Sequence, residues 1–575
     1  MHKTRLFGQS HWMNGIAQFL DILEMIEPYT QADSKMIRDL QRCKYLGKMI
    51  KSQRTPPWPT VPTTDLPPKE LADTLVDIYL RTIESVYRTL HIPTFRRDYE
   101  AIWGVNTAPD MAFVIQIKLV MAIGASIYDD NFSLRALATR WVYEAQSWVS
   151  EPQFKRRLDV QFLQTNILLL LAREIVGVDG GLIWIAAGQL IRLATYMGFH
   201  RDPVYLPKRT TFICEMRRRI WNTVIEIALQ TSMESGGPPL LGLEDFDTQP
   251  PGNLDDEQIM TEDPMPRSDE TLTEMSIALA LRRMFPLRLV IARVLNGIGA
   301  PTPYGEIIRI DEELRRLYKT TCRNFQAQNT GNTNTPSLFQ TSLLDYLVRR
   351  YLMALHMPFF ALALQETAYA FSRRVIVDTA MRIRYLIYPP SKISSFIPGD
   401  PMPTGQDLAR LAKCGSAPFR TCSTQSCFLI ASELKAQLQE EEGPGPVPLR
   451  QDLLSALDDA KGWALGCLEV GETNTKGYLF LSLVAMQIDG LRRGLAKDQI
   501  AELLAKTAED AQARALVVME EKAAEVQGTD MNLENMGGIP DESIPNLMGD
   551  WDFMMPDTHF YFGDSDTINW VNTVL

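Results

Sequence analysis

Closely spaced cysteines are missing from this sequence. Its 575 residues include seven cysteines, and none of them forms a Cys-x2-Cys pair. The nearest two, Cys422 and Cys427, have four residues between them and no other Cys or His close by. An odd number of widely spaced cysteines argues against a disulfide scaffold and against a zinc site built from neighbouring ligands. We therefore expect reduced thiols in a core, and no metal ligand is predicted.

Motifs of catalysis are also missing. The six histidines are scattered without a His-x3-His pair, and the chain has neither a Gly-x4-Gly-Lys-Ser/Thr loop nor a Gly-x-Ser-x-Gly elbow. Acidic pairs such as Asp129-Asp130 and Asp255-Asp256 are more typical of solvated loop charges than of acid–base catalysis. We predict no catalytic residue, no cofactor-binding residue and no enzyme, while a site assembled from distant residues is left open.

Long apolar runs are scarce. The most apolar stretch, residues 113–128, is short and contains Gln116 and Lys118, so we expect no membrane-spanning helix. Acidic residues within 21–27 interrupt the first apolar pattern, which is unlike a secretory signal peptide. By elimination, these absences indicate a cytosolic or nuclear location.

Helical periodicity is what the chain does contain. Apolar residues recur every three or four positions over most of residues 66–526, and no alternating strand pattern is found. Residues 160–176 are apolar nearly all round, which predicts a helix in the centre of the core. We predict an all-α, multi-helix domain over residues 66–526, preceded by a basic, proline-rich linker region at 1–65 and followed by a flexible acidic tail at 527–575.

The predicted linker region has an unusual charge. Residues 1–56 contain nine Lys/Arg and five Asp/Glu, whereas the whole chain has a net charge of −12. Because these basic residues are dispersed, with no basic helix or aromatic platform evident, a solvated surface is favoured over a phosphate-binding site. Six prolines within residues 55–68 argue against a helix there and indicate an extended linker or a strap over the surface.

A series of ordered features lies between residues 180 and 256. A helix ends near residues 194–202, three consecutive arginines follow within residues 215–221, and then come a Gly236-Gly237-Pro238 break and a loop rich in Asp and Pro at 245–256. This order resembles the middle homology region of fungal zinc-cluster transcription factors, the fungal-specific transcription factor domain. The resemblance is strongest over residues 70–370. It departs from the family at single positions, where Gly237 replaces the usual Arg and Asn222 replaces a second Trp.

The resemblance implies a transcription regulator in the nucleus, with residues 66–526 as its regulatory domain and a metabolic or secondary-metabolite gene set as its target. The six clustered cysteines of the family's zinc module are absent from these residues. Zinc, and direct contact with DNA, are therefore expected only if such a module lies upstream. The alternative is a co-regulator that acts through a DNA-binding partner. A homodimer is a further expectation, and no membrane partner is expected.

The last residues differ in composition from all others. Residues 523–575 contain ten acids and no Lys or Arg, with aromatic residues interspersed. The acids keep the aromatic side chains solvated and available to a partner's apolar groove, as in acidic activation segments. We predict an activator whose tail contacts the transcription machinery or coactivators through Trp551, Phe553, Phe560, Phe562 and Trp570. The alternative is a tail that folds back on the domain, with the same aromatics as anchors.

Overall fold

Helices form all the regular secondary structure in the part of the chain that the computed structural model describes, so the prediction of an all-α fold is confirmed. The described residues are 7–29, 34–104, 110–152, 158–178, 182–299, 301–327, 335–388, 406–416, 418–439 and 449–527. The predicted tail contacts at Trp551, Phe553, Phe560, Phe562 and Trp570 lie outside them.

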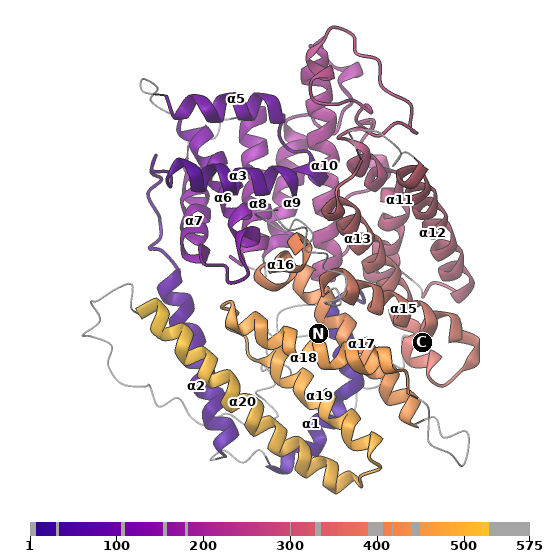
Figure 1. Ribbon diagram of the computed structural model, residues 1–575. Coiled ribbons are helices and arrows are strands. Elements are labelled where there is room, and N and C mark those ends of the chain that lie inside the picture. The colour runs from indigo at the N-terminus through magenta and orange to yellow at the C-terminus, as the bar shows by residue number, and fades with distance from the viewer. Residues whose placement is uncertain are drawn as a thin grey trace.

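The helices follow one another along the chain, and the connection from α10 to α11 is long (Figure 1). The N-terminal and middle α-helices are α1 (Leu20–Ile26), α2 (Lys35–Arg54), α3 (Lys69–Arg81), α4 (Glu84–Tyr87), α5 (Ile92–Ile102), α6 (Met111–Tyr128), α7 (Arg135–Ser150), α8 (Val160–Val176), α9 (Ile183–Tyr196) and α10 (Thr211–Ser235). The later α-helices are α11 (Ser276–Asn296), α12 (Tyr304–Ala327), α13 (Leu338–His356), α14 (Phe360–Ala363), α15 (Ala370–Ile387), α16 (Asp407–Cys414), α17 (Pro418–Gln439), α18 (Gln451–Glu469), α19 (Lys476–Arg492) and α20 (Lys497–Gln527).

Short 3-10 helices occur at turns and at the ends of α-helices. They are η1 (Trp12–Phe19), η2 (Glu27–Tyr29), η4 (Pro203–Tyr205), η5 (Leu243–Asp245), η6 (Gln258–Met260), η7 (Met357–Phe359) and η8 (Thr367–Tyr369). A proline at position 358 explains η7, because proline removes a backbone donor and interrupts the α-helical pattern after α13.

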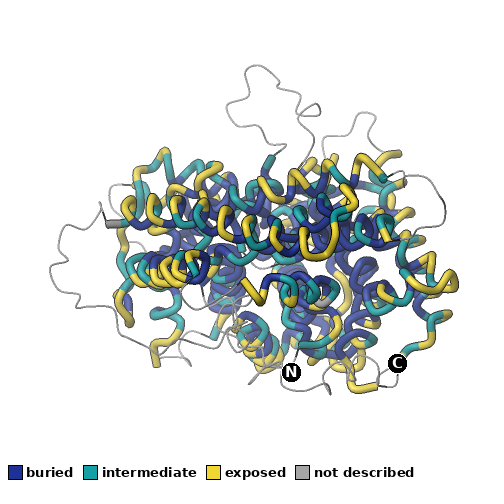
Figure 2. The backbone as a smooth tube through the Cα atoms, turned by 90° about the horizontal axis from the view of Figure 1, so that it is seen from below, coloured by how far each residue is buried: buried dark blue, intermediate teal, exposed yellow. Residues whose placement is uncertain are grey.

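Neighbouring helices pack in sequence to form one continuous core. In the first half α6 packs against α3, α7 and α8, and the series continues through α9 and α10 to α11. In the second half α13, α15, α17, α19 and α20 pack in turn, while α16 contacts both α6 and α13 and joins the halves. Figure 2 shows that the buried side of most helices faces the interior and the exposed side faces outward.

Helix α6 lies at the centre of the first half. All residues from Val114 to Ile127 are buried. By length and composition α6 could cross a membrane, but 78% of its 18 residues are buried inside the protein. A side chain at Gly124 would place its Cβ 2.2 Å from the backbone oxygen of Leu75, so only glycine permits this approach of α3. The apolar character of α6 is therefore explained by its place in the core.

Helix ends follow the local sequence closely. Helix α8 occupies the predicted residues 160–176, begins after Asp159, whose side chain accepts a hydrogen bond from the Phe162 amide, and ends at Gly177 with φ +83°. Helix α10 ends at Gly236, where φ is +69°, so the predicted break at Gly236-Gly237-Pro238 is confirmed. All seven cysteines are free, as expected.

The N-terminal region differs from the prediction, because residues 12–29 and 35–54 form helices of the same body instead of a linker. Phe19 of η1 is fully buried, and its ring contacts Phe428 and Phe480 at centroid distances of 6.3 and 6.2 Å. Helix α2 packs along α20. The prediction that this region lacks a basic helix is also wrong, since α2 contains seven of its basic residues. The sequence pattern was missed because charged residues dilute the apolar face of α2.

The proline-rich residues 55–68 are extended and cross the surface of α7, as predicted for a strap. The Thr60 amide donates to Ser147 Oγ at 3.0 Å. The buried Lys118 ammonium of α6 donates to the Thr63 carbonyl at 2.6 Å and forms an ion pair with Glu144 of α7. The strap therefore supplies oxygen atoms that a buried lysine needs.

Candidate functional site

Helix α10 contains the three consecutive arginines of the sequence motif, and each binds a different part of the fold. The guanidinium of Arg217 donates to the carbonyls of Met197 and Gly198, at 3.2 and 2.7 Å, and lies 4.2 Å from the centre of the Phe199 ring. Carbonyls at a helix C-terminus lack partners within the helix. Arg217 therefore caps the end of α9 and fixes its angle to α10.

Arg218 binds two carboxylates. It donates to Asp202 at 2.9 Å and to Glu215 at 2.7 Å. Asp202 also accepts hydrogen bonds from the backbone amides of Val204 and Gln249. Burial opposes ionisation of Asp202, but the hydrogen bonds from Arg218 and these amides hold its pKa below the usual value. This cluster attaches the loop after α9 to the Asp- and Pro-rich loop.

Arg219 is buried and forms an ion pair with Asp256 at 2.5 Å, and it donates to the Leu254 carbonyl at 3.1 Å. A second buried arginine, Arg88, pairs with the same carboxylate. The other oxygen of Asp256 accepts the Ile92 amide at 2.9 Å. The expectation that the Asp255-Asp256 pair consists of solvated loop charges is therefore wrong, since both residues are buried. Asp256 joins α10, α5 and the loop before α11.

His91 belongs to the same structural cluster. Its Nδ1 accepts the Thr94 amide at 3.3 Å at the start of α5, and its Nε2 lies 3.0 Å from the Asp256 carbonyl oxygen. These contacts hold His91 in the turn before α5. A single ring with both nitrogens engaged by local backbone or hydroxyl groups has no free position for proton transfer to a substrate.

The second half of α10 forms further buried ion pairs with later helices. Glu226 binds the fully buried Arg288 of α11 through two bonds, at 2.6 and 2.7 Å. Glu234 binds Arg350 of α13 at 2.7 Å and accepts the hydroxyl of Thr421 of α17 at 2.7 Å. We call the ion pairs of α10 with Asp202, Asp256, Arg288 and Arg350 the α10 hub. The hub ties the motif region to both halves of the core.

Two buried carboxylates have strongly raised pKa values. Burial raises the pKa of Glu84 to about 7 and the pKa of Glu174 to about 8, and in Glu174 the nearby charge of Glu234 adds to the effect. Glu84 accepts the Tyr79 hydroxyl at 2.7 Å and the Leu90 amide at 2.8 Å. These bonds give Glu84 a role in the turn after α4.

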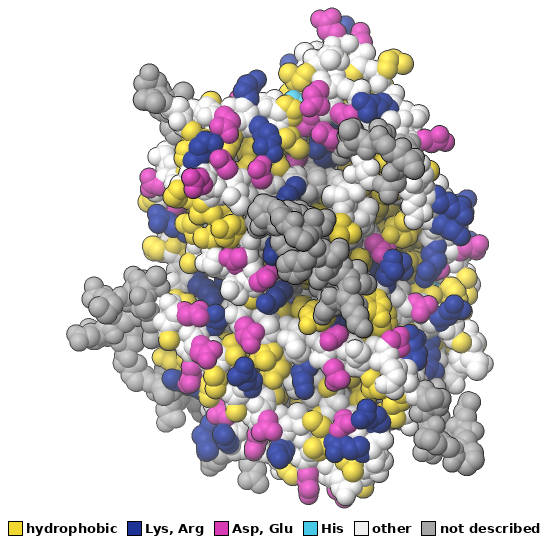
Figure 3. Space-filling model, in the orientation of Figure 1, with side chains coloured by type: hydrophobic (Ala, Val, Ile, Leu, Met, Phe, Trp, Pro, Cys, Tyr) yellow, Lys and Arg dark blue, Asp and Glu magenta, His cyan; other side chains and the backbone are white. Residues whose placement is uncertain are grey.

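Most Arg-Arg doublets among the described residues form ion pairs with acidic residues. Arg315 pairs with Asp311 at 2.7 Å and Arg373 with Glu433 at 2.7 Å. On the face shown in Figure 3, basic and acidic side chains are interspersed and do not gather into an extended field of one sign. That face has no feature typical of a DNA-binding surface.

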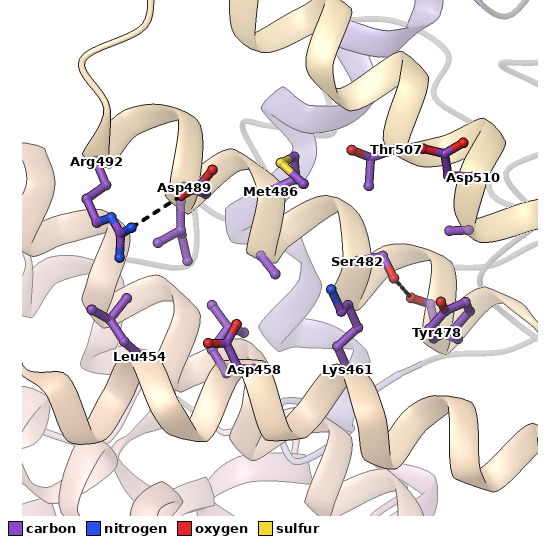
Figure 4. Close-up of a pocket in the computed structure, with 14 residues that line it drawn as sticks. Leu454, Asp458, Lys461, Tyr478, Ser482, Met486, Asp489, Arg492, Thr507 and Asp510 are labelled. Atoms are coloured by element: carbon purple, nitrogen blue, oxygen red, sulfur yellow. Dashed lines mark hydrogen bonds and ion pairs between the residues drawn. The ribbon is translucent and has the colours of Figure 1, made fainter. Parts of the chain in front are cut away.

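One cavity lies between α18, α19 and α20 and has a volume of about 440 Å³. Its lining combines apolar residues such as Leu457 and Ile488 with charged residues, several of which are labelled in Figure 4. At the rim Arg492 forms an ion pair with Asp489 at 3.6 Å, and Lys461 of α18 rises toward Ser482 of α19. The mixture of opposite charges specifies no single class of ligand.

A second cavity of about 610 Å³ lies between α7, α8 and α9. Its lining combines apolar residues such as Leu170 with the amides of Asn166 and Gln189 and with two arginines, Arg173 and Arg192. Cavities of this size between helices can hold small molecules. Within the described part of the chain, no group of three or more His, Cys, Asp or Glu side chains is placed to hold a metal ion.

These features define a helical domain held by buried ion pairs, without an evident catalytic arrangement among its described residues. Residues 76–319 match the family model described as the fungal specific transcription factor domain, so this part of the chain is similar to that domain. The match includes α10 and its partners Arg88, Asp202, Asp256 and Arg288, and it confirms the resemblance seen in the sequence.

Several relatives are similar over most of the chain. It is 32% identical to transcription factor lepE of Aspergillus flavus over 525 residues, which cover 86% of this chain and 61% of the relative. It is 32% identical to transcription factor opdR of Penicillium oxalicum, and the match covers 86% of this chain and 66% of the relative. It is 26% identical to the aspyridones cluster regulator apdR of Emericella nidulans, where the match covers 74% of this chain and 57% of the relative. The chain thus spans less than two thirds of the length of these relatives. The names of these relatives are those of transcription factors.

Proposed function

We propose that the chain acts in the nucleus as an activator of a fungal gene set for a secondary metabolite. The composition of residues 523–575, with ten acids, interspersed aromatics and no basic residue, carries the proposal of activation. The name of apdR, a cluster regulator, supports the choice of gene set. The buried ion pairs of the α10 hub are consistent with a structural role for the helical domain.

A fusion of residues 523–575 to an unrelated DNA-binding domain tests the activation segment. We expect reporter transcription above that of the DNA-binding domain alone. We expect most of this added transcription to be lost when five aromatic residues are replaced with alanine, because they provide the apolar contacts with a coactivator. These residues are Trp551, Phe553, Phe560, Phe562 and Trp570. Absence of activation, or full activation by the alanine variant, would refute this part of the proposal.

Two routes to the promoter remain in the proposal. In the first, a zinc-cluster module upstream of these residues binds DNA and holds the zinc. In the second, the chain is a co-regulator that lacks such a module and associates with a DNA-binding partner. Sequencing the 5′ end of the transcript separates them: an in-frame exon with six clustered cysteines supports the first. Co-purification of a partner that contains the module supports the second.

We further propose that the helical domain, residues 66–526, forms a homodimer or restrains the tail at residues 527–575. Sedimentation of the purified chain at several concentrations measures its oligomeric state.

Deleting the gene and measuring transcripts tests which genes the protein regulates. We expect a coordinated decrease in transcripts of a set of biosynthetic genes, whereas an increase would identify a repressor.

A further inference from the structure

Helix α2 has a row of basic side chains that no described part of the fold neutralises. Lys44, Lys48 and Lys51 follow one another at spacings of four and three residues, so they are neighbours on one side of the helix. All three are exposed, and none forms an ion pair with any residue in the described ranges. We call these three residues the lysine row.

The charge of α2 is exceptional in this acidic chain. The helix contains seven Lys/Arg and one acid, Asp39, which gives seven minus one, or +6, against −12 for the whole chain. Outside the row, Arg42 forms an ion pair with Glu520 of α20 at 3.8 Å. Uncompensated charges of one sign on a helix face create a local positive potential that attracts acidic partners.

The C-terminal end of α20 lies against α2. Ala523 and Val526 of α20 belong to the same apolar cluster as Leu46 and Ile50 of α2. Figure 1 shows the yellow C-terminal end of α20 beside α2. The chain therefore continues into residues 528–575 from a point next to the lysine row.

Those remaining residues are complementary to the row in charge and sufficient in length. Residues 528–575 contain nine acids and no Lys or Arg. The lysine row extends along α2 for only about 10 Å, at 1.5 Å per residue, whereas an extended chain can span about 3.3 Å per residue. A short tether also raises the effective concentration of the acids at the row to about the millimolar range.

We propose that residues 528–575 of this chain dock on the lysine row of α2. Their carboxylates accept hydrogen bonds from the three ammonium groups. Trp58, which is 56% exposed just after α2, offers an apolar surface to the aromatics of the tail. The docking follows from charge and position alone. Its consequence, that the docked tail is withheld from coactivators, rests on the proposed activation function.

A DNA backbone is the other polyanion that could bind lysines. Without the nine acids of residues 528–575, the net charge of the remaining residues is −12 plus nine, or −3, so the body does not attract DNA as a whole. The tail, by contrast, is held beside the row by the chain itself. The observations therefore favour the tail as the occupant.

Carbodiimide cross-linking of the full chain tests the docking directly, since this reagent joins a lysine amine to a carboxylate in contact with it. We expect cross-links from Lys44, Lys48 and Lys51 to acids within residues 528–575 at about 0.1 M salt. Their yield is expected to fall about tenfold at 1 M salt, because the Debye length shrinks from about 10 Å to about 3 Å.

The triple variant K44Q/K48Q/K51Q provides a second measurement by small-angle X-ray scattering. At low salt its radius of gyration is expected to exceed that of the unchanged protein and to match the value that the unchanged protein has at high salt. The matched control R316Q/K319Q/R323Q removes three exposed charges at spacings of three and four residues on α12, and it should leave the radius unchanged.

Cross-links spread evenly over surface lysines, or equal radii for the triple variant and the control, would overturn the docking. Binding of a short DNA duplex that needs the lysine row, together with no cross-link from the row to the tail, would assign the row to phosphates instead. The reporter fusion of residues 523–575 gives an independent readout. Docking without reporter activation would refute the activation function alone, and activation without docking would refute the docking alone.

Discussion

Helices α10 and α2 are both rich in charge, but they use it in opposite ways. On α10 the arginines and glutamates are largely buried and each binds a partner from another segment, as in the pairs Arg219–Asp256 and Glu226–Arg288. On α2 the lysines are exposed and three of them have no acidic partner among the described residues. The comparison teaches that the same residue types can hold a fold together or remain free for a partner, depending on what the fold places beside them.

The largest expected effect comes from breaking one ion pair of the α10 hub. Replacing Glu226 with Leu leaves the Arg288 guanidinium buried without its carboxylate, and we expect the unfolding free energy to fall by about 3–5 kcal/mol. Urea denaturation followed by circular dichroism measures the change. Replacing Lys48 of α2 with Gln is the contrasting variant, and its effect should stay within about 0.5 kcal/mol because that side chain is exposed and has no acidic partner in the described ranges.

A second substitution checks the physical reason for that loss. The double variant Glu226→Leu/Arg288→Met removes both charges, and most of the lost stability is expected to return because an apolar pair replaces a buried ion pair. If the double variant is as unstable as Glu226→Leu alone, packing and not the unpaired charge is the cause. If Lys48→Gln is equally destabilising, the contrast between α10 and α2 is wrong.

A smaller effect is expected where helices approach without charges. Gly124→Ala places a methyl group against the Leu75 carbonyl, and overpacking of this kind should cost about 1–3 kcal/mol. At Gly462 of α18 an added Cβ would meet no neighbouring described atom within 4 Å, so Gly462→Ala should stabilise the protein by about 0.5–1 kcal/mol. Opposite shifts of the thermal unfolding midpoint are expected, and a loss of stability in both variants would contradict the close-approach argument.

Stability is also expected to change with pH. Since burial raises the pKa of Glu174 from 4.5 to about 8, the folded protein binds more protons than the unfolded chain between these values. Stability should therefore fall as pH rises through this window, by at most about 1.4 kcal/mol per pH unit. Glu174→Gln is expected to reduce this slope in urea denaturation series, whereas the exposed Glu312→Gln should not change it. An unchanged slope in Glu174→Gln would show that another group is responsible.

Much of the helical pattern could be predicted because it depends on neighbouring residues. The apolar residues between Val160 and Val176, with Asp159 before them and Gly177 after them, predicted α8 at its observed bounds. Gly236 likewise marked the end of α10. Helix α2 was missed because its basic residues dilute the apolar periodicity, and its buried face becomes evident only where Cys43, Leu46 and Ile50 meet α20.

The site was harder to predict than the fold. The sequence identified the three arginines at 217–219 as a motif, but not that Arg219 shares Asp256 with Arg88, which lies 131 positions earlier in the chain. No local signal distinguished the buried Asp256 from the exposed Glu257. The arginines of the Arg-Arg doublets are simpler, because their acidic partners often lie three or four residues away on the same helix, as Asp311 does for Arg315.

The sequence by itself determined the helical class, most helix ends, the free cysteines and the acidic tail, because each depends on composition or on contacts within a few residues. The tertiary structure alone decided which charges are buried and which remain exposed. It placed Asp256 between two arginines and Glu226 against Arg288, and it left Lys44, Lys48 and Lys51 in solvent beside the end of α20. The physical reason is that the energy of a charge depends on the groups around it, and those groups come from distant parts of the chain.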